Sequence, residues 1–306
     1  MNKLNIIQSD AEDRSYTQQI KPKTFRELTK ARFDREWKKD PEQFNPLRNA
    51  RERTRIERTF RFISNRIELR GLKIADLGSG HGHLTRMYRD AGGIIDAVDI
   101  ARLANDALAD EKNIRPVQSC VPHTHLDDGA YDLVACTELI GHLSPKEHRL
   151  LFNEIARLSK REGSILFSTS IDIHSEDALE KLFFLIQTEL EIVDFQVSHH
   201  SRHIALKNFF SMPRHFAHAS RDKNFRKNAL SDRHSIWRYW FQWNSTKFSG
   251  MLWKWIAPIS NWFERTIDQS RSLLLLLEKL SHSEPSISHI IILARKKPLF
   301  PDAGDQ

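Results

Sequence analysis

Short apolar runs alternate with amphipathic stretches through the middle of the chain, from residue 71 to residue 200. The runs are rich in Val, Ile and Leu, which is typical of strands buried on both faces of a sheet. The stretches between them repeat their apolar positions at helical spacing. Alternation of this kind predicts an α/β fold in which helices cover both faces of a mostly parallel sheet.

The same pattern gives the limits of each predicted element. Strands are predicted at Lys73–Leu77, Ile94–Ile100, Ile114–Cys120, Tyr131–Thr137, Ser164–Ser168 and Glu191–Ser198. Helices are predicted between them at Leu84–Ala91, Arg102–Ala109, Pro145–Lys160 and Ser175–Glu189.

The two flanks of this region follow other patterns. Apolar positions at helical spacing predict helices at Lys23–Lys39 and Asn49–Leu69, separated by a proline-containing break at 40–46. Residues 201–285 indicate a mainly helical segment, with Gly250 and Pro258 as interruptions. A β-branched run at Ser288–Lys296 then predicts a last strand.

The charge of the chain is divided between its segments. Its 306 residues carry 47 Lys and Arg against 40 Asp and Glu, a formal net charge of +7. Residues 71–200 count 12 basic and 21 acidic side chains, a net of −9, whereas residues 1–70 carry +7 and residues 201–285 carry +8. An acidic middle between basic flanks argues against a uniform nucleic-acid-binding surface.

Cysteine content and apolar run lengths bear on the compartment. Cys120 and Cys136 are too few for a disulfide framework, which favours a reducing cytoplasm. The N-terminus has no apolar core of a signal peptide, and no stretch reaches the ~20 apolar residues of a spanning helix. We therefore expect a cytoplasmic protein that does not cross a membrane, although association with a membrane surface stays open.

A glycine-rich turn is the sharpest chemical signal. In KIADLGSGHGHL, residues 73–84, a buried strand leads through Asp76 into Gly78, Gly80 and Gly82 before a helix begins. Glycines at a strand-to-helix turn let the backbone approach a ligand closely. The G-x-G-x-G spacing departs from the dinucleotide pattern, and the Gly-Lys-Ser/Thr of a phosphate loop is absent. The next strand ends with Asp99, where an acid can accept hydrogen bonds from ribose hydroxyls.

This strand, loop, helix and acid together resemble the class I S-adenosylmethionine-dependent methyltransferases. The order of elements is most similar to the small-molecule O-methyltransferases of ubiquinone biosynthesis. The resemblance implies a Rossmann-like, doubly wound, seven-stranded sheet whose last strand is antiparallel. It also implies N-terminal helices and a helical insertion between strands six and seven. The predicted units are an N-terminal arm at 1–48, a methyltransferase domain at 49–200 and 286–297, and a basic aromatic insertion at 201–285 that caps the substrate.

The resemblance also implies roles for individual residues. S-adenosyl-L-methionine is the expected cofactor, with its methionine end on Asp76 and the loop backbone, its ribose on Asp99 and its adenine beside Ile100. The expected cofactor-binding residues are Asp76, Leu77, Gly78, Ser79, Gly80, Gly82, Asp99, Ile100, Cys120, Val121, Glu138 and Leu139. Cys120 stands where the family often has an acid, so Asp127 or Asp128 is an alternative contact for adenine.

His142 is the predicted general base, because histidine titrates near neutral pH. Its structural alternative is to cap the helix that begins near Ser144 or to pack in the loop. The Pro-Pro-Tyr/Phe signature of N-methylating enzymes is absent, and Cys136 lacks the preceding proline of cytosine-methylating enzymes. A metal-dependent variant needs a second acid where Gly141 stands, so no metal is predicted, although His199 and His200 are further candidate ligands.

Residues 236–263 mix tryptophan, phenylalanine and basic residues, and they allow three interpretations. They form an aromatic cap over the sheet, a face that meets lipid headgroups, or an RNA-binding surface. The predicted function is S-adenosylmethionine-dependent O-methylation of a small apolar or membrane-associated acceptor. The alternatives are an RNA methyltransferase and a methyltransferase-like binding protein without turnover. The sequence leaves the oligomeric state open.

Overall fold

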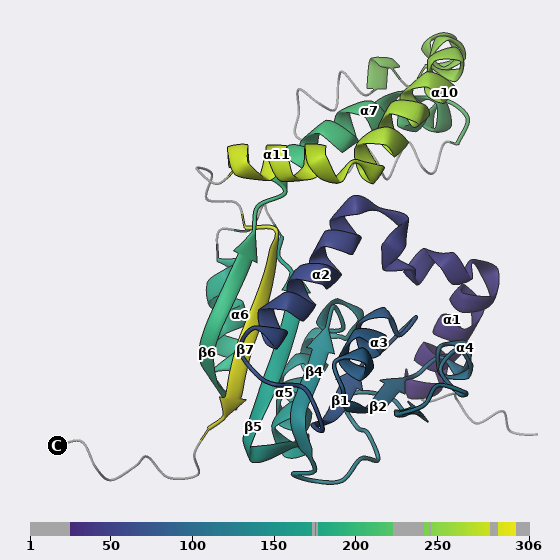
Figure 1. Ribbon diagram of the computed structural model, residues 1–306. Coiled ribbons are helices and arrows are strands. Elements are labelled where there is room, and N and C mark those ends of the chain that lie inside the picture. Colours follow the sequence, from purple (N-terminus) through teal and green to yellow (C-terminus); the bar gives the residue numbers. More distant parts are fainter. Residues whose placement is uncertain are drawn as a thin grey trace, which may run out of the picture.

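The computed structural model describes residues 25–172, 175, 177–222, 242–244, 246–281 and 287–297. Within these residues a seven-stranded sheet has the order β3-β2-β1-β4-β5-β7-β6, with helices on both faces (Figure 1). The strands are β1 (Lys73–Leu77), β2 (Ile94–Asp99), β3 (Ile114–Gln118), β4 (Tyr131–Thr137), β5 (Ser159–Ser170), β6 (Leu190–Ser198) and β7 (His289–Lys296).

The helices of the domain stand close to their predicted positions. They are α1 (Phe25–Lys39), α2 (Ala50–Ser64), α3 (His83–Asp90), α4 (Arg102–Asp106), α5 (Pro145–Leu158) and α6 (Ala178–Ile186). Short 3-10 turns follow as η1 (Pro41–Phe44), η2 (Pro46–Arg48) and η3 (Ile140–His142). The α2 helix ends at Ser64 rather than at the predicted Leu69, and Leu69 is instead buried in the connection to β1.

The last strand inserts as predicted. Strands β1 to β5 run parallel to their neighbours, whereas β7 lies antiparallel between β5 and β6. Buried side chains of α5 and α6 pack on one face of the sheet, and those of α2 and α3 pack on the other. Because both faces are covered, the strands are apolar along most of their length, which is why they stood out in the sequence. The predicted fold class is confirmed.

The N-terminal arm crosses the carboxyl ends of the first strands. Trp37 of α1 is 5% exposed and stacks on Phe44 of η1, with 5.4 Å between the ring centroids. The Trp37 ring also lies 4.5 Å from that of His81, in the glycine loop. A hydrogen bond of 2.6 Å joins Nε2 of His81 to the carbonyl of Pro41. The arm therefore covers the glycine loop. Residues 1–24 of the predicted arm lie outside the described residues.

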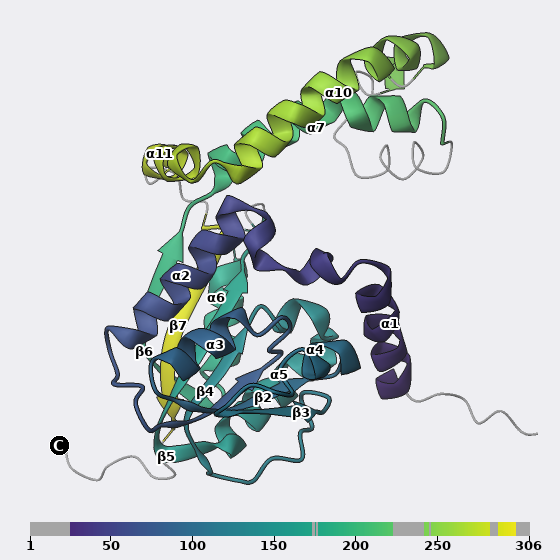
Figure 2. The same ribbon diagram turned by 45° about the vertical axis from the view of Figure 1, so that its right-hand side comes forward.

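The insertion between β6 and β7 projects away from the sheet (Figures 1 and 2). It contains α7 (Ser201–Ala219), α10 (Lys247–Gln269) and α11 (Arg271–Ser281), and α10 packs along α7. Residues 223–241, with Trp237 and Trp240, lie outside the described residues. Within the described residues, no helix is both long enough and apolar enough to span a bilayer.

The prediction that Gly250 and Pro258 interrupt this segment is wrong, because α10 runs through both. Gly250 marks a close approach of two helices, since a Cβ there would lie 2.1 Å from Oγ of Ser220. Pro258 removes one backbone donor, yet packing against α7 continues on both sides of it. Trp253 contacts Phe216 before the proline, and Phe263 stacks on Phe210 after it.

A buried ion pair fastens the insertion to the domain. Arg58 of α2 donates two hydrogen bonds of 2.6 Å to Glu278 of α11, and a third of 3.1 Å to Ser198 at the end of β6. Glu278 is 5% exposed, and His200 lies beside it. Burial lowers the pKa of His200 to about 4, against the raising effect of Glu278. The imidazole is therefore neutral, and Arg58 is the cation that balances the buried carboxylate.

We predict that Glu278→Gln destabilises the fold, because it leaves the Arg58 charge without its partner. The expected loss is about 3 kcal/mol in the free energy of unfolding, as is typical when one member of a buried pair is removed. Urea denaturation measures it. The matched control is Glu191→Gln, which breaks an exposed pair with Arg295 and should cost less than about 1 kcal/mol. Equal effects of the two variants would contradict the anchoring role.

Candidate active site

A cavity of about 220 Å³ lies at the carboxyl ends of β1, β2 and β4. Parallel sheets bind ligands at this edge, where the strand order reverses. Its wall contains most of the predicted site residues, which are Asp76, Gly78, Ser79, Gly80, Asp99, Ile100, Cys120, Val121, Glu138, Leu139 and His142. Leu77 and Gly82 are outside this lining.

The glycine loop is shaped by hydrogen bonds to the neighbouring strand. The N–H groups of Gly78 and Ser79 both donate to the carbonyl of Val98, at 2.8 and 3.1 Å. Gly78 and Gly80 have φ angles of +78° and +52°, which glycine adopts without strain. A Cβ on Gly80 would meet no atom within 4 Å, so the backbone there borders open space. The loop thus offers bare backbone to a ligand in the cavity.

Leu77 and Gly82 have packing roles beside the loop. The side chain of Leu77 is fully buried in the core, which leaves only its backbone near the loop. Gly82 begins α3 with a φ of +71°, and a Cβ there would lie 2.5 Å from Cδ2 of Leu108. Gly82 is therefore required for packing behind the loop. The sequence could not separate this requirement from ligand contact, because both call for glycine.

Asp99 ends β2 and is held by two backbone donors. Its Oδ2 accepts from the N–H of Gly80 at 3.0 Å, and its Oδ1 accepts from Ala101 at 2.8 Å. Burial raises the pKa of Asp99, against the lowering effect of these backbone bonds. Each carboxylate oxygen has a second lone pair, so the group can still accept hydrogen bonds from the cavity.

Asp76, at the end of β1, is a second acid of the cavity. It is 2% exposed, and Thr85 donates a hydrogen bond of 2.5 Å to its Oδ2. Burial raises the pKa of Asp76 to about 6, although the Thr85 bond acts in the opposite direction. The ionised form of a buried carboxylate is stabilised by a cation that binds beside it. The cavity wall is thus prepared for a positively charged group at this point.

On the side of the cavity predicted to hold adenine, the buried polar group is the hydroxyl of Ser119 rather than an acid. Ser119, Cys120 and Val121 all line the cavity. Oγ of Ser119 is buried and has no hydrogen-bond partner among the described residues. Asp127 and Asp128, the predicted replacements, are not in the lining, and Asp128 pairs with Arg157 on the surface.

Three aromatic residues of the arm also line the cavity and were missed. They are Phe33, Trp37 and Phe44. Helical spacing predicted a helix with Phe33 and Trp37 among its apolar positions, and Phe44 lies in the predicted break that follows it. Nothing in the sequence indicated that these residues meet the glycine loop. The arm closes one side of the cavity with apolar rings, so a ligand bound there is shielded from water on that side.

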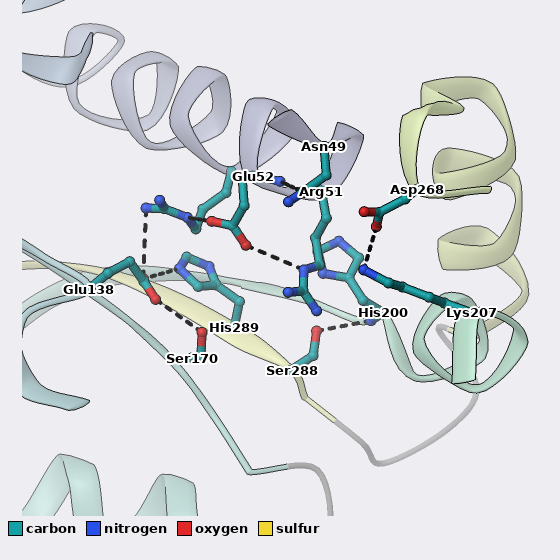
Figure 3. A network of polar contacts seen from close by, with 11 residues as sticks. Asn49, Arg51, Glu52, Glu138, Ser170, His200, Lys207, Asp268, Ser288 and His289 are labelled. Atoms are coloured by element: carbon teal, nitrogen blue, oxygen red, sulfur yellow. Dashed lines mark hydrogen bonds and ion pairs between the residues drawn. The ribbon is translucent and has the colours of Figure 1, made fainter. Parts of the chain in front are cut away.

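Glu138 follows β4 and joins several elements (Figure 3). It accepts hydrogen bonds from His289 of β7 at 2.8 Å and from Ser170 of β5 at 3.0 Å, with Arg55 of α2 at 3.9 Å. Burial alone would raise its pKa, but the His289 bond and the Arg55 charge lower it to about 2. Its φ of +58° is unusual for a residue with a side chain. Glu138 is therefore a fixed anion.

His142 stands at the exposed rim of the cavity, in η3. Its ring meets that of Phe33 edge to face, with 5.6 Å between centroids. The capping alternative is wrong, because Ser144 and Glu147 form the capping box of α5. The proposed extra metal ligand His200 belongs to the Glu278 cluster instead.

A second cavity, of about 920 Å³, adjoins the first. Five residues line both cavities, namely Phe44, Pro46, Arg55, Glu138 and His142. The rest of the wall comes from the arm, the start of α2, η3, the end of β5 and the end of α10, and much of it is charged or polar. These residues are Asn45, Arg48, Asn49, Glu52, Gly141, Thr169, Ser170, Arg265, Asp268 and Gln269.

Comparison with known proteins defines the class. Residues 75–167, which include the glycine loop, Asp99 and Glu138, match the family described as methyltransferase domain. The predicted resemblance is confirmed: the chain carries a methyltransferase domain of the S-adenosylmethionine-dependent class. S-adenosylmethionine is accordingly the cofactor that the site indicates.

Individual relatives are more distant. The chain is 29% identical over 114 residues to a ubiquinone biosynthesis O-methyltransferase of Coxiella burnetii, a match covering 36% of this chain and 48% of the relative. The same enzyme of Xanthomonas oryzae pv. oryzae is 28% identical over 115 residues, covering 35% and 47%. The chain thus spans about half the length of the curated relatives it matches. Among solved structures, the PH0226 protein of Pyrococcus horikoshii OT3 is 16% identical, with a TM-score of 0.46 over 53% of this chain and 92% of that one.

The residues present fit this cofactor. Asp76 faces the cavity as a buried anion suited to the methionine ammonium group, and Asp99 is a fixed acceptor suited to ribose hydroxyls. The unpartnered hydroxyl of Ser119 suits a polar edge such as that of adenine. The open space beside Gly80 leaves room for a ligand to approach the backbone of the glycine loop.

We predict that Asp99→Ala weakens S-adenosylmethionine binding about tenfold to a hundredfold, because hydroxyl groups lose a charged acceptor. Isothermal titration calorimetry measures the affinity. The control is Asp110→Ala, which removes an exposed acid beyond α4 and should leave binding unchanged. Unchanged affinity in a folded Asp99→Ala protein would exclude Asp99 from the cofactor site.

Proposed function

We propose that this protein transfers a methyl group from S-adenosylmethionine to an oxygen atom of a small acceptor that enters through the second cavity. One observation supports this most directly. The cofactor cavity and the second cavity share part of their walls, and Glu138 and His142 belong to this shared part together with Phe44, Pro46 and Arg55. A site that brings two ligands together at one point suits a transfer between them.

The bound cofactor would supply a methyl group activated by a sulfonium charge. In this proposal Asp76 holds the methionine ammonium group, and Asp99 orients the ribose. Glu138, whose carboxylate cannot easily be protonated, contributes a fixed negative charge near the junction of the cavities. Phe33, Trp37 and Phe44 exclude water from the cofactor side. The protein's contribution is therefore mainly orientation and electrostatics.

The second cavity adds a constraint on the acceptor. Arg48, Glu52, Arg55, Arg265 and Asp268 contribute to its wall. Charged side chains stay hydrated unless a ligand replaces their water with hydrogen bonds. The end of the acceptor that enters the site therefore carries polar groups. A membrane-associated acceptor with a polar head satisfies this constraint, whereas an entirely apolar molecule does not.

His142 is proposed as the base that removes the proton from the acceptor hydroxyl. It lies at the junction, where it lines both cavities. A phenol or alcohol is a weak nucleophile until its proton leaves, and a positioned histidine contributes roughly 10²- to 10⁴-fold to such a step. Proximity of acceptor and methyl group would supply the rest.

The RNA interpretation receives less support from the basic helix α2. Several arginines in and just after this helix are engaged within the protein, namely Arg55 with Glu52, Arg58 with Glu278 and Arg66 with Asp194. Arginines paired in this way are poor phosphate ligands, because binding RNA would first break an existing ion pair.

The function is tested by incubating the full chain with methyl-labelled S-adenosylmethionine and a panel of acceptors. The panel contains catechols with and without an isoprenoid tail, an anionic lipid extract and total RNA. Label on a catechol oxygen or in the lipid fraction supports the proposal. Label in RNA alone, or cofactor binding without transfer to any acceptor, would contradict it in favour of the corresponding alternative.

We predict that the affinity for S-adenosylmethionine falls as the pH drops below about 6. Asp76 has a pKa of about 6 before a cation is present, and only its ionised form pairs with the ammonium group. Each pH unit below that value should weaken binding up to about tenfold. Calorimetry between pH 5 and pH 8 measures this. Asp76→Asn should bind more weakly and lose this dependence; a variant with the original pH profile would exclude the pairing.

We predict that His142→Ala lowers the rate of methyl transfer about a hundredfold at neutral pH, with little change in cofactor affinity. Single-turnover transfer to the best acceptor of the panel measures the rate. The control is His125→Ala, an exposed histidine outside both cavities, which should leave the rate unchanged. Retained turnover in His142→Ala would show that proximity alone drives the reaction.

A further inference from the structure

The outer face of α10 carries a continuous stripe of exposed apolar side chains. Its members repeat at helical spacing over sixteen positions, a length of about 22 Å along the axis. They are Phe248 at 84% exposed, Met251 at 62%, Leu252 at 58%, Trp255 at 79%, Ile259 at 62%, Trp262 at 61% and Phe263 at 41%. Trp243, just before the helix, is 76% exposed. Large apolar patches of this kind mark interaction sites.

Most of the stripe is separate from the packing of the insertion itself, and only Phe263, at its edge, also stacks on Phe210 of α7. The inner face of α10 supplies Trp253, whose ring lies 5.2 Å from that of buried Phe216 of α7. Ser260, also buried, donates a hydrogen bond to the carbonyl of Phe210. The helix therefore already has a partner on its inner side. The outer aromatic residues are in excess of what the fold requires.

The net charge beside the stripe is positive. The α7 and α10 helices together contain six Lys and Arg residues against two acids, Glu264 and Asp268. The helices α7 and α10 form a hairpin, and both acids are paired within it. Glu264 pairs with Arg214 at 3.0 Å, and Asp268 pairs with Lys207 at 2.8 Å. Figure 3 shows the second of these pairs. The hairpin consequently presents surplus positive charge beside its apolar face, including exposed Lys254 and Arg265.

We propose that this face of α10 lies in the headgroup region of an anionic lipid bilayer. Tryptophan, phenylalanine and leucine on one face, with basic residues beside them, are the features of helices that bind in the plane of the interface. The complementary charge favours anionic lipid, with an attraction that is felt within a Debye length of the surface. A second copy of the chain carries the same positive charge, which opposes pairing of two such faces.

The binding mode has a consequence for the active site. The same helix that carries the stripe ends at Arg265, Asp268 and Gln269, which line the second cavity. Docking of α10 brings that cavity next to the membrane surface, where a lipid-dissolved acceptor with a polar head can enter it. This last step rests on the proposed function, whereas the membrane docking itself does not.

Co-sedimentation with vesicles tests the proposal. Vesicles of phosphatidylcholine alone are compared with an equal mixture of phosphatidylcholine and phosphatidylglycerol, at low and high salt. We expect binding to the anionic vesicles, weakening at high salt, with a blue shift of tryptophan emission. Trp255→Ser with Trp262→Ser should weaken binding at least about tenfold, because binding strength follows buried apolar area.

The matched control is Phe184→Ser, which removes a side chain 76% exposed on α6, away from the hairpin. It should leave vesicle binding unchanged. Circular dichroism and S-adenosylmethionine affinity, measured on each variant, confirm that the fold is intact, and the affinity reports the proposed function independently. Equal vesicle binding by the double variant and the original chain would overturn the proposal. So would a dimer that the double variant abolishes while vesicles are not bound.

Discussion

The negative charge of Glu138 is the constraint on which the two cavities depend. Its carboxylate accepts hydrogen bonds from Ser168 and Ser170 of β5 and from His289 of the neighbouring β7. It also faces the guanidinium group of Arg55 in α2. The backbone conformation at this residue costs roughly 1–3 kcal/mol in most proteins, and these contacts offset it. Because the same side chain lines both cavities, fixing it also fixes where they meet. Strand β7 enters the sheet late in the chain, yet it supplies the closest hydrogen bond of this cluster.

The opposite charges of the segments follow from this architecture. Asp76 and Asp99, two acids of the sheet segment, line the first cavity. Some basic residues pair with acids between the sheet domain and the insertion, as Arg58 does with Glu278, whereas others, such as Lys254, are exposed on the insertion. The net charge of +7 therefore combines segments of opposite charge. The positive charge that α7 and α10 carry beyond their own acids is the part that can attract an external anion.

Much of the fold was predictable because its signals are local. The buried strands, the glycine turn and Asp99 are set by apolar periodicity and by backbone geometry, and both can be recognised in a short window of sequence. The cavity-lining role of Trp37 was not predictable, because it depends on where α1 packs. The same holds for His289, which contacts Glu138 across 151 positions of sequence. Continuity of α10 through Pro258 likewise depends on tertiary packing, which overrides the local preference of proline.

We expect the cavity at the carboxyl ends of β1, β2 and β4 to hold S-adenosylmethionine. Equilibrium dialysis of the unmodified chain against labelled S-adenosylmethionine tests it most directly, because it counts bound ligand without requiring an acceptor. We predict one bound molecule per chain, released by excess S-adenosylhomocysteine, which shares the adenosine and amino acid ends but lacks the methyl group. No retained label at millimolar ligand, or label that S-adenosylhomocysteine leaves in place, would contradict the assignment.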